Sequence, residues 1–133
     1  MPSIATSNRT IGDVVKHEDL TQWGICRTQA TVLAATGMQI GSVLESDGDG
    51  TYSWVEDADV AGLPADVGIL IDEGIYDGVT GDRTLTLLNI PVPGANAVIA
   101  KNTLSYGDAV SAPNQVIVEA ALAARGILLV DQV

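Results

Sequence analysis

The chain has 133 residues and a formal net charge of −11 at pH 7, because seventeen Asp and Glu residues outnumber six Lys and Arg residues. Phosphate groups bind Lys and Arg, so we expect neither nucleic acid nor an anionic membrane as a partner. A chain of this length fits one domain and can bury a real core. The single cysteine, Cys26, excludes an internal disulfide and a cysteine metal cluster.

The sequence contains neither a recognisable signal peptide nor a candidate membrane-spanning segment. Apolar stretches stay well below the roughly 20 residues of a membrane-spanning helix. Residues 1–10 lack the apolar stretch of a signal peptide. We therefore expect a soluble protein that is made and used without export.

The N-terminal segment differs in character from the rest of the chain. Residues 1–19 are polar and mixed, with too few apolar side chains to build a core. Their Thr, Ile and Val residues do accept a strand conformation. We predict an extended N-terminal arm over residues 1–19 and a single β-rich domain over residues 20–133. A frayed terminus is the alternative.

Glycines divide the next part of the chain into apolar runs of strand length. The predicted strands are residues 20–29, 32–33, 40–44, 67–71, 84–90, 97–100 and 127–130. Trp23 or Cys26 is expected to face inward from the first of them. The sequence Asp-Gly-Asp-Gly at residues 47–50 predicts the tip of a β-hairpin. Loops are predicted at the acidic residues 56–66 and the turn-rich residues 72–83.

One helix is predicted near the C-terminus. Pro113 suits a first helical turn, and residues 115–125 follow it with Val116, Ala120 and Ala124 on one face. Gly126 has the place of a residue that ends a helix in the left-handed conformation. The fold class is therefore mainly β, with one C-terminal helix and an extended N-terminal arm.

Catalytic equipment is not evident. His17 is the only histidine and lies in the polar arm between Lys16 and Glu18, where we expect a solvated side chain. No nucleophile elbow, phosphate-binding loop or dinucleotide fingerprint occurs. We predict a protein that is not an enzyme, with no cofactor and no bound metal.

A calcium site is the alternative from a different functional class. Residues 45–56 have the length of an EF-hand loop, with Glu45, Asp47, Asp49 and Glu56 at its first, third, fifth and last positions and Gly50 at the sixth. The first ligand is Glu where the motif prefers Asp, and the flanks do not favour helices. A hairpin tip explains the Asp and Gly residues without a metal. A small ligand- or calcium-binding β module at Asp47, Asp49 and Glu56 stays open as an alternative.

The order of several short segments resembles the head decoration proteins of tailed phages, the lambda-type capsid-stabilising family. The segments are Thr31-Val32, GMQIGSVL at 37–44, GTY at 50–52, ADVGIL at 65–70, AVIA at 97–100 and AALAARGI at 120–127. The likeness covers most of the chain after about residue 28. Residues 74–94 depart from it, being longer and more apolar than the family pattern, and the part before Trp23 matches only in character.

The resemblance implies a small β domain of β-tulip or β-clip type that forms a homotrimer. It implies a cement protein on the outer surface of an expanded phage head, synthesised in the host cytoplasm and then part of the virion. The implied partners are the major capsid protein and two further copies of the chain. Another virion part, such as a tail or fibre domain, is the alternative within the same class.

The resemblance also implies an N-terminal arm that pairs with a strand of the capsid. Main-chain hydrogen bonds at a sheet edge contribute only about 0.5–1.5 kcal/mol each, so one arm binds weakly and three arms on a trimer bind together. The expected arm contacts are Ser3, Ile4, Thr6, Asn8, Arg9, Thr10, Ile11 and Val14. For the trimer contact we expect Tyr52, Trp54 and Leu63, as apolar side chains near loops.

Overall fold

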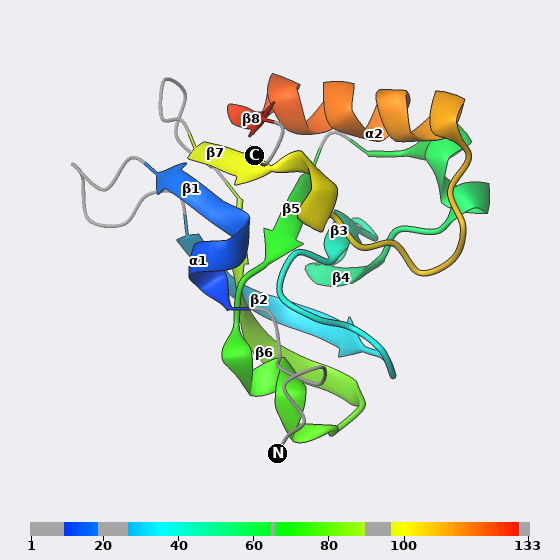
Figure 1. Ribbon diagram of the computed structural model, residues 1–133. Helices are drawn as coiled ribbons and strands as arrows, with labels where there is room; N and C mark the ends of the chain where they lie inside the picture. The colour runs from blue at the N-terminus through cyan, green and yellow to red at the C-terminus, as the bar shows by residue number, and fades with distance from the viewer. Residues whose placement is uncertain (1–9, 19–26, 65, 90–96, 131–133) are drawn as a thin grey trace, which may run out of the picture.

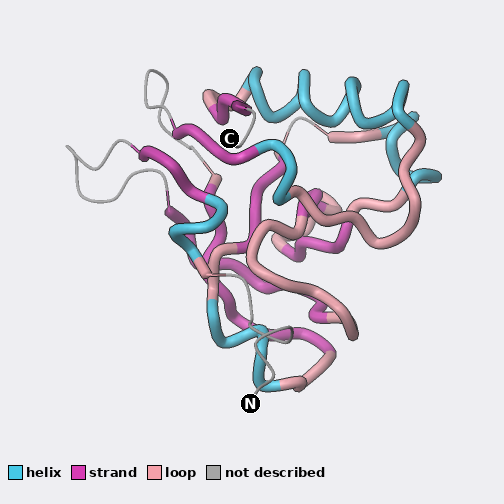
Figure 2. Tube along the Cα trace, viewed as in Figure 1, coloured by secondary structure: helices cyan, strands magenta, loops and turns pink. Residues whose placement is uncertain are grey.

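The computed structural model describes residues 10–18, 27–64, 66–89 and 97–130 (Figure 1). The described chain is mainly β with one long helix near the C-terminus, which confirms the predicted class. Figure 2 shows how the strands gather into two groups, with the long helix along one margin.

Five strands form a closed barrel in the order β2-β4-β3-β5-β6. They are β2 (Arg27–Ala34), β3 (Val43–Ser46), β4 (Thr51–Trp54), β5 (Val67–Leu70) and β6 (Gly81–Leu88). The longest ladder is antiparallel and joins β2 to β6 from Arg27↔Leu88 to Ala34↔Gly81. Only the β2–β4 pairing in this barrel is parallel. Closure leaves the barrel without a long free edge, which is where β proteins aggregate.

The predicted hairpin is confirmed. β3 and β4 pair antiparallel with Leu44 opposite Trp54 and Ser46 opposite Tyr52. Gly48 and Gly50 have φ of 95° and 97°, a conformation that glycine adopts without a Cβ penalty. Asp47 Oδ1 accepts hydrogen bonds from the backbone N–H groups of Asp49 at 3.0 Å and Thr51 at 3.3 Å. The Asp-Gly repeat therefore serves the turn directly.

A second sheet has the order β1-β7-β8. It contains β1 (Val15–Glu18), β7 (Ala97–Ala100) and β8 (Ile127–Val130), and a single helical turn, α1 (Ile11–Val14), precedes β1. β1 pairs antiparallel with β7 through an irregularity between Val15 and His17, and β8 pairs parallel with β7. The predicted arm boundary at residue 19 is therefore wrong, because the domain already includes residues 10–18.

The C-terminal helix, α2 (Ala112–Ala124), has Pro113 in its first turn and Gly126 beyond its end with φ of 90°, as predicted. Its buried side chains are Val118 and Leu122. Val116 and Ala120, which were predicted to share one face, do share it, but that face is exposed to solvent. The helix carries apolar residues on both sides, so periodicity alone does not identify the side that packs.

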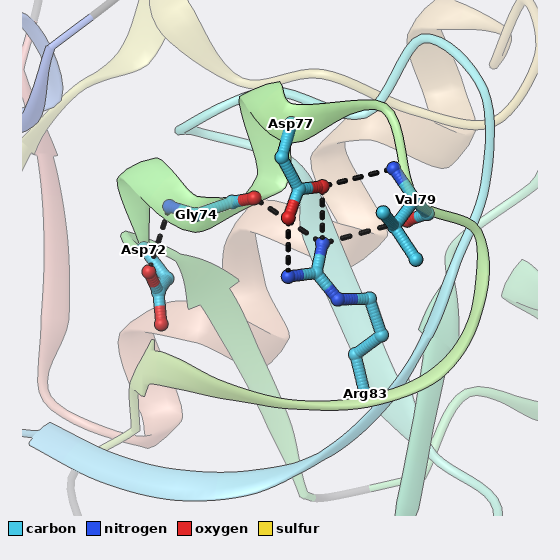
Figure 3. A network of polar contacts seen from close by, with 5 residues as sticks. All are labelled: Asp72, Gly74, Asp77, Val79 and Arg83. Carbon is cyan, nitrogen blue, oxygen red and sulfur yellow. Dashed lines mark hydrogen bonds and ion pairs between the residues drawn. The ribbon is translucent and has the colours of Figure 1, made fainter.

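Short 3-10 turns occupy the predicted loops: η2 (Asp57–Gly62), η3 (Glu73–Asp77) and η4 (Lys101–Thr103). η3 is tied to β6 by a double ion pair, in which Arg83 Nη1 and Nη2 each lie 2.8 Å from an oxygen of Asp77 (Figure 3). Arg83 Nη1 also donates to the carbonyl oxygens of Gly74 and Val79. This planar fork orders the turn-rich segment, and β6 begins earlier than predicted, at Gly81.

The buried side chains form two clusters. One lies inside the barrel and includes Val32, Leu44 and Leu85. The other joins the barrel to the second sheet and α2, and it includes Val14, Ile99 and Leu122. The second cluster is what fixes α2 and β8 on the barrel, and through them the surface described next.

Candidate protein–protein interface

An exposed apolar surface extends over α2 and β8. Val116 is 64% exposed, Ile117 48%, Leu128 48% and Val130 42%. In a soluble monomer, large apolar side chains of this kind are usually scattered singly, whereas a contiguous patch marks a site of interaction. α2 lies along one margin of the molecule (Figure 1).

The helical part of this surface has no charged residue. We define the α2–β8 face by its exposed residues, which are Ala112, Pro113, Val116, Ile117, Ala120, Ala123, Ala124, Leu128 and Val130. A solvated helix normally carries charged side chains on its outer side. The absence of charge from this face is unusual in a chain with a net charge of −11.

A groove separates α2 from β8 and belongs to the same surface. Its volume is about 490 Å³, and Ala123, Leu128 and Val130 are among its lining residues. Lys101 and Glu119 also line it, and their Nζ and Oε1 atoms lie 3.5 Å apart, so their charges offset one another. Among the described strands β8 pairs with β7 alone, so it lies at the edge of this sheet. The surface therefore combines a helix face, a groove and an uncharged strand edge.

Both ends of α2 are held by polar contacts, which makes the face rigid. Near the start, Asp57 Oδ1 accepts hydrogen bonds from the Ser111 N–H and from Asn114 Nδ2, each at 2.9 Å. These donors lower the pKa of Asp57, the Ser111 N–H contributing most and Asn114 next. Just past the other end, the guanidinium of Arg125 contacts Asp66 and Asn89.

The contacts of Arg125 belong to a network that includes a predicted trimer residue. The Tyr52 hydroxyl donates to Asp66 Oδ2 at 2.8 Å and accepts from Asn89 Nδ2 at 3.0 Å. Burial, and next its hydrogen bond to Asp66, raise the pKa of Tyr52 to about 12. Tyr52 is only 7% exposed. Its prediction as a trimer contact is therefore wrong, because the ring packs in the barrel and the hydroxyl forms its hydrogen bonds within the same chain.

The other two predicted trimer residues lie apart from each other in the core. Leu63 is partly buried and packs against the cluster that joins barrel and helix. Trp54 is partly buried against the cluster inside the barrel. Neither belongs to the α2–β8 face. The sequence prediction considered only large apolar side chains near loops and did not include this face. The sequence signal for this surface was a predicted helix with no charged residue on one whole side.

The predicted arm contacts divide at Thr10. Ser3, Ile4, Thr6, Asn8 and Arg9 lie outside the described residues. Thr10 is exposed and precedes α1, where its backbone N–H donates to Asp13 Oδ2 at 2.8 Å. Ile11 packs against the core, and Val14 is fully buried in it. Val14 is therefore wrong as a capsid contact, because exposing it would open the core.

The calcium alternative gains no support from the loop geometry. Glu45 lies within the β3–β4 ladder. Asp47 and Asp49 lie at the hairpin tip, and their carboxylate oxygens accept hydrogen bonds from nearby backbone N–H groups. An EF-hand loop instead wraps its ligands around one point. Within the described ranges, no group of three or more His, Cys, Asp or Glu side chains is placed to hold a metal ion.

Among the described carboxyl groups, Glu45 has the most strongly shifted pKa. Burial, followed by the negative charge of Asp59 and a hydrogen bond to it, raises the pKa of Glu45 from 4.5 to about 7. Its Oε2 atom is buried and has no hydrogen-bond partner among the described residues. Burial and the nearby negative charge thus keep a proton on Glu45 up to near neutral pH.

We expect Glu45→Gln to stabilise the protein at pH 8 and to leave stability nearly unchanged at pH 4. The folded state holds the Glu45 proton more tightly, so the wild type loses stability as the pH rises from about 4.5 through 7. Because Glu45 is only partly buried, solvent screens part of its charge, and we expect a gain of about 1 kcal/mol at pH 8. Urea denaturation at several pH values measures it. The exposed Glu73→Gln is the control, and equal effects of both variants would contradict the assignment to Glu45.

Comparison with protein families, curated proteins and solved structures finds no match to this chain. None of the described helices is long and apolar enough to cross a membrane. The assignment of function therefore depends on the chain's own surface.

Proposed function

We propose that this protein is a capsid decoration protein, which binds as a homotrimer to the outer surface of an expanded phage head and stabilises it. The observation that carries the proposal is the α2–β8 face, an uncharged apolar surface on an otherwise acidic molecule. The capsid is proposed as the second partner because the order of several sequence segments resembles the lambda-type family. A role in assembly requires two surfaces, one for copies of the chain and one for the shell.

Charge favours a second copy as the occupant of the α2–β8 face. Two chains that each carry −11 repel one another over most of their surfaces. Contact between copies is therefore least unfavourable where no carboxylate is exposed. The paired charges of Lys101 and Glu119 at the groove add no net charge to this contact.

The shape of the face suits a ring. It has a helix half, with Val116 and Ile117, and a strand half, with Leu128 and Val130. If the helix half of one copy packs on the strand half of the next, the contact is head-to-tail, and such contacts form a ring when the rotation between copies closes and an open filament when it does not. Burying a large aliphatic side chain contributes about 1.5–3 kcal/mol when it starts fully exposed, and about half of that here. Association costs at least about 4 kcal/mol, so a single contact is weak and ring closure stabilises the assembly.

The capsid contact in this proposal is restricted to residues 1–9. α1 and β1 join the domain and fix the point at which the preceding residues depart. A short arm that pairs with a capsid strand gains a few hydrogen bonds and loses backbone entropy of about 1–2 kcal/mol per residue. Three arms on one trimer offset this weakness, because the second and third contacts are intramolecular.

Self-association is tested by placing a charge in the α2–β8 face. We expect the wild-type protein to have three times the 13.7-kDa chain mass in light scattering. We expect Val116→Glu to have the mass of one chain, because burying a carboxylate costs several kcal/mol. Val79→Glu is the matched control, since Val79 is 54% exposed and lies outside the face. A wild-type monomer, or a trimer that survives Val116→Glu, would sink this part of the proposal.

Capsid binding is tested by co-sedimentation with purified expanded heads. Deletion of residues 2–9 removes the proposed contact and stops before Val14, so the core stays complete. We expect the truncated protein to remain folded and trimeric and to lose binding to heads. Saturation of heads by the truncated trimer would remove the arm from the proposal. Rings of more than three copies, or long fibres, under the electron microscope would instead favour a tail or fibre component.

A further inference from the structure

A second hollow lies on the barrel, at the C-terminal ends of β2 and β4. It has a volume of about 310 Å³ and shares no residue with the α2–β8 face. Its lining residues are Leu33, Ala35, Met38, Ser53, Trp54, Glu56 and Asp59. Pockets of this size with apolar walls and a few charged groups are typical binding sites.

The apolar wall of the hollow is fixed before any ligand arrives. Trp54 Nε1 donates a hydrogen bond of 3.0 Å to the Ser105 carbonyl oxygen, which holds the indole ring. The ring lies close to Gly37, where a Cβ atom would come 3.6 Å from Trp54 Cη2. Met38 lines the hollow and is 5% exposed, whereas Leu33 is 49% exposed and accessible to a partner. An aromatic ring held in this way loses little entropy on binding.

The rim of the hollow is acidic. Glu56 is positioned by Gly107, where a Cβ atom would come within 2.6 Å of Glu56 Cγ. Asp59 Oδ2 accepts a hydrogen bond of 3.0 Å from the Glu56 N–H, so the two carboxylates lie on one turn. Neither makes an ion pair with a cation of the described chain, whereas Arg83, Lys101 and Arg125 each pair with a carboxylate elsewhere.

Glu45 adds to the negative potential beside this rim. It is opposite Ser53 in the β3–β4 ladder, and residues opposite one another in a ladder project from the same face. It also contacts Asp59. The wall therefore has an apolar part for one side chain, next to carboxylates that form no ion pair with a cation of the described residues.

We propose that this hollow binds a peptide segment of a partner protein in which an apolar side chain adjoins a Lys or Arg. The apolar side chain enters between Leu33, Met38 and Trp54, and the cation pairs with Glu56 and Asp59. Charge complementarity selects this occupant over a second copy of the chain, which is strongly acidic. The site goes beyond the proposed function and is independent of trimer formation, because it lies outside the α2–β8 face.

An array of nine-residue peptides tests the proposal. The central residue is varied over all amino acids, and its neighbours are Lys, Ser or Glu. We expect labelled protein to bind peptides with central Leu, Met or Phe and flanking Lys, and to lose at least tenfold in binding when Glu replaces Lys. We expect this binding to weaken with added salt.

Two protein variants and one control locate the binding. Glu56→Lys and Leu33→Asp alter the exposed rim and wall, and we expect each to reduce binding at least tenfold. Glu73→Lys changes the net charge as Glu56→Lys does, but on exposed η3, and we expect it to bind as the wild type. We also expect the indole N–H signal of Trp54 to shift on titration with the best peptide. Equal losses for both lysine variants, or no selection for an apolar centre, would overturn the proposal.

Discussion

Leu122→Ala is expected to lower the free energy of unfolding by about 3 kcal/mol, the largest effect of any single truncation in α2. Leu122 is fully buried and belongs to the cluster that joins the helix to the barrel and to the second sheet. Truncation removes the apolar contacts of the side chain and leaves a cavity, because the helix is held near both ends and cannot collapse onto the gap. Urea denaturation at fixed protein concentration measures the change.

Leu33→Ala is the matched control for this truncation. It deletes the same atoms from a side chain that is 49% exposed, and we expect a loss below about 1 kcal/mol. A small effect of Leu122→Ala, similar to that of Leu33→Ala, would mean that α2 is not docked through Leu122. The orientation of the α2–β8 face would then need revision.

Asn89→Ala is expected to destabilise the protein by about 2–3 kcal/mol, although it removes few atoms. Asn89 is 4% exposed and donates to Asp66 Oδ1 at 2.7 Å and to the Tyr52 hydroxyl at 3.0 Å. It also accepts a hydrogen bond from Arg125. The truncation leaves three partners short of a contact in a largely buried place, and unpaired buried polar groups are costly. Thermal and urea denaturation together measure the loss.

Asn102→Ala, at an exposed asparagine of η4, is the control and should be nearly neutral. Tyr52→Phe and the double variant complete a mutant cycle with Asn89→Ala. We expect the double variant to lose less than the sum of the single losses, because the two side chains share a hydrogen bond. Strict additivity would show that the network does not act as a unit.

Local sequence signals predicted the elements that depend on local chemistry. The Asp-Gly repeat at 47–50 predicted the hairpin, and Pro113 with Gly126 predicted the limits of α2. The strands at 97–100 and 127–130 were predicted with their observed bounds. In each place the turn residue or the apolar run determines the conformation without help from distant parts of the chain.

Features that depend on distant contacts were predicted poorly. β1 lies in a polar segment and is a strand because β7 provides its hydrogen-bond partners. The buried side of α2 is set by what packs beneath it, since both sides of the helix are apolar. Tyr52, Asp66 and Asn89 are far apart in sequence, and no spacing rule connects them. The hollow beside Trp54 likewise arises from two separate segments, residues 33–38 and 53–59.

The closing ladder between β2 and β6 has a consequence for how the chain is made. β2 leaves the ribosome before β3, β4 and β5, yet its principal partner follows them all. Until Leu88 has emerged, the earlier strand stays unpaired along most of its length and open to other nascent chains. Late pairings of this kind slow folding and favour aggregation. Synthesis at high level should therefore yield more usable protein at low temperature or with chaperones that shield extended segments.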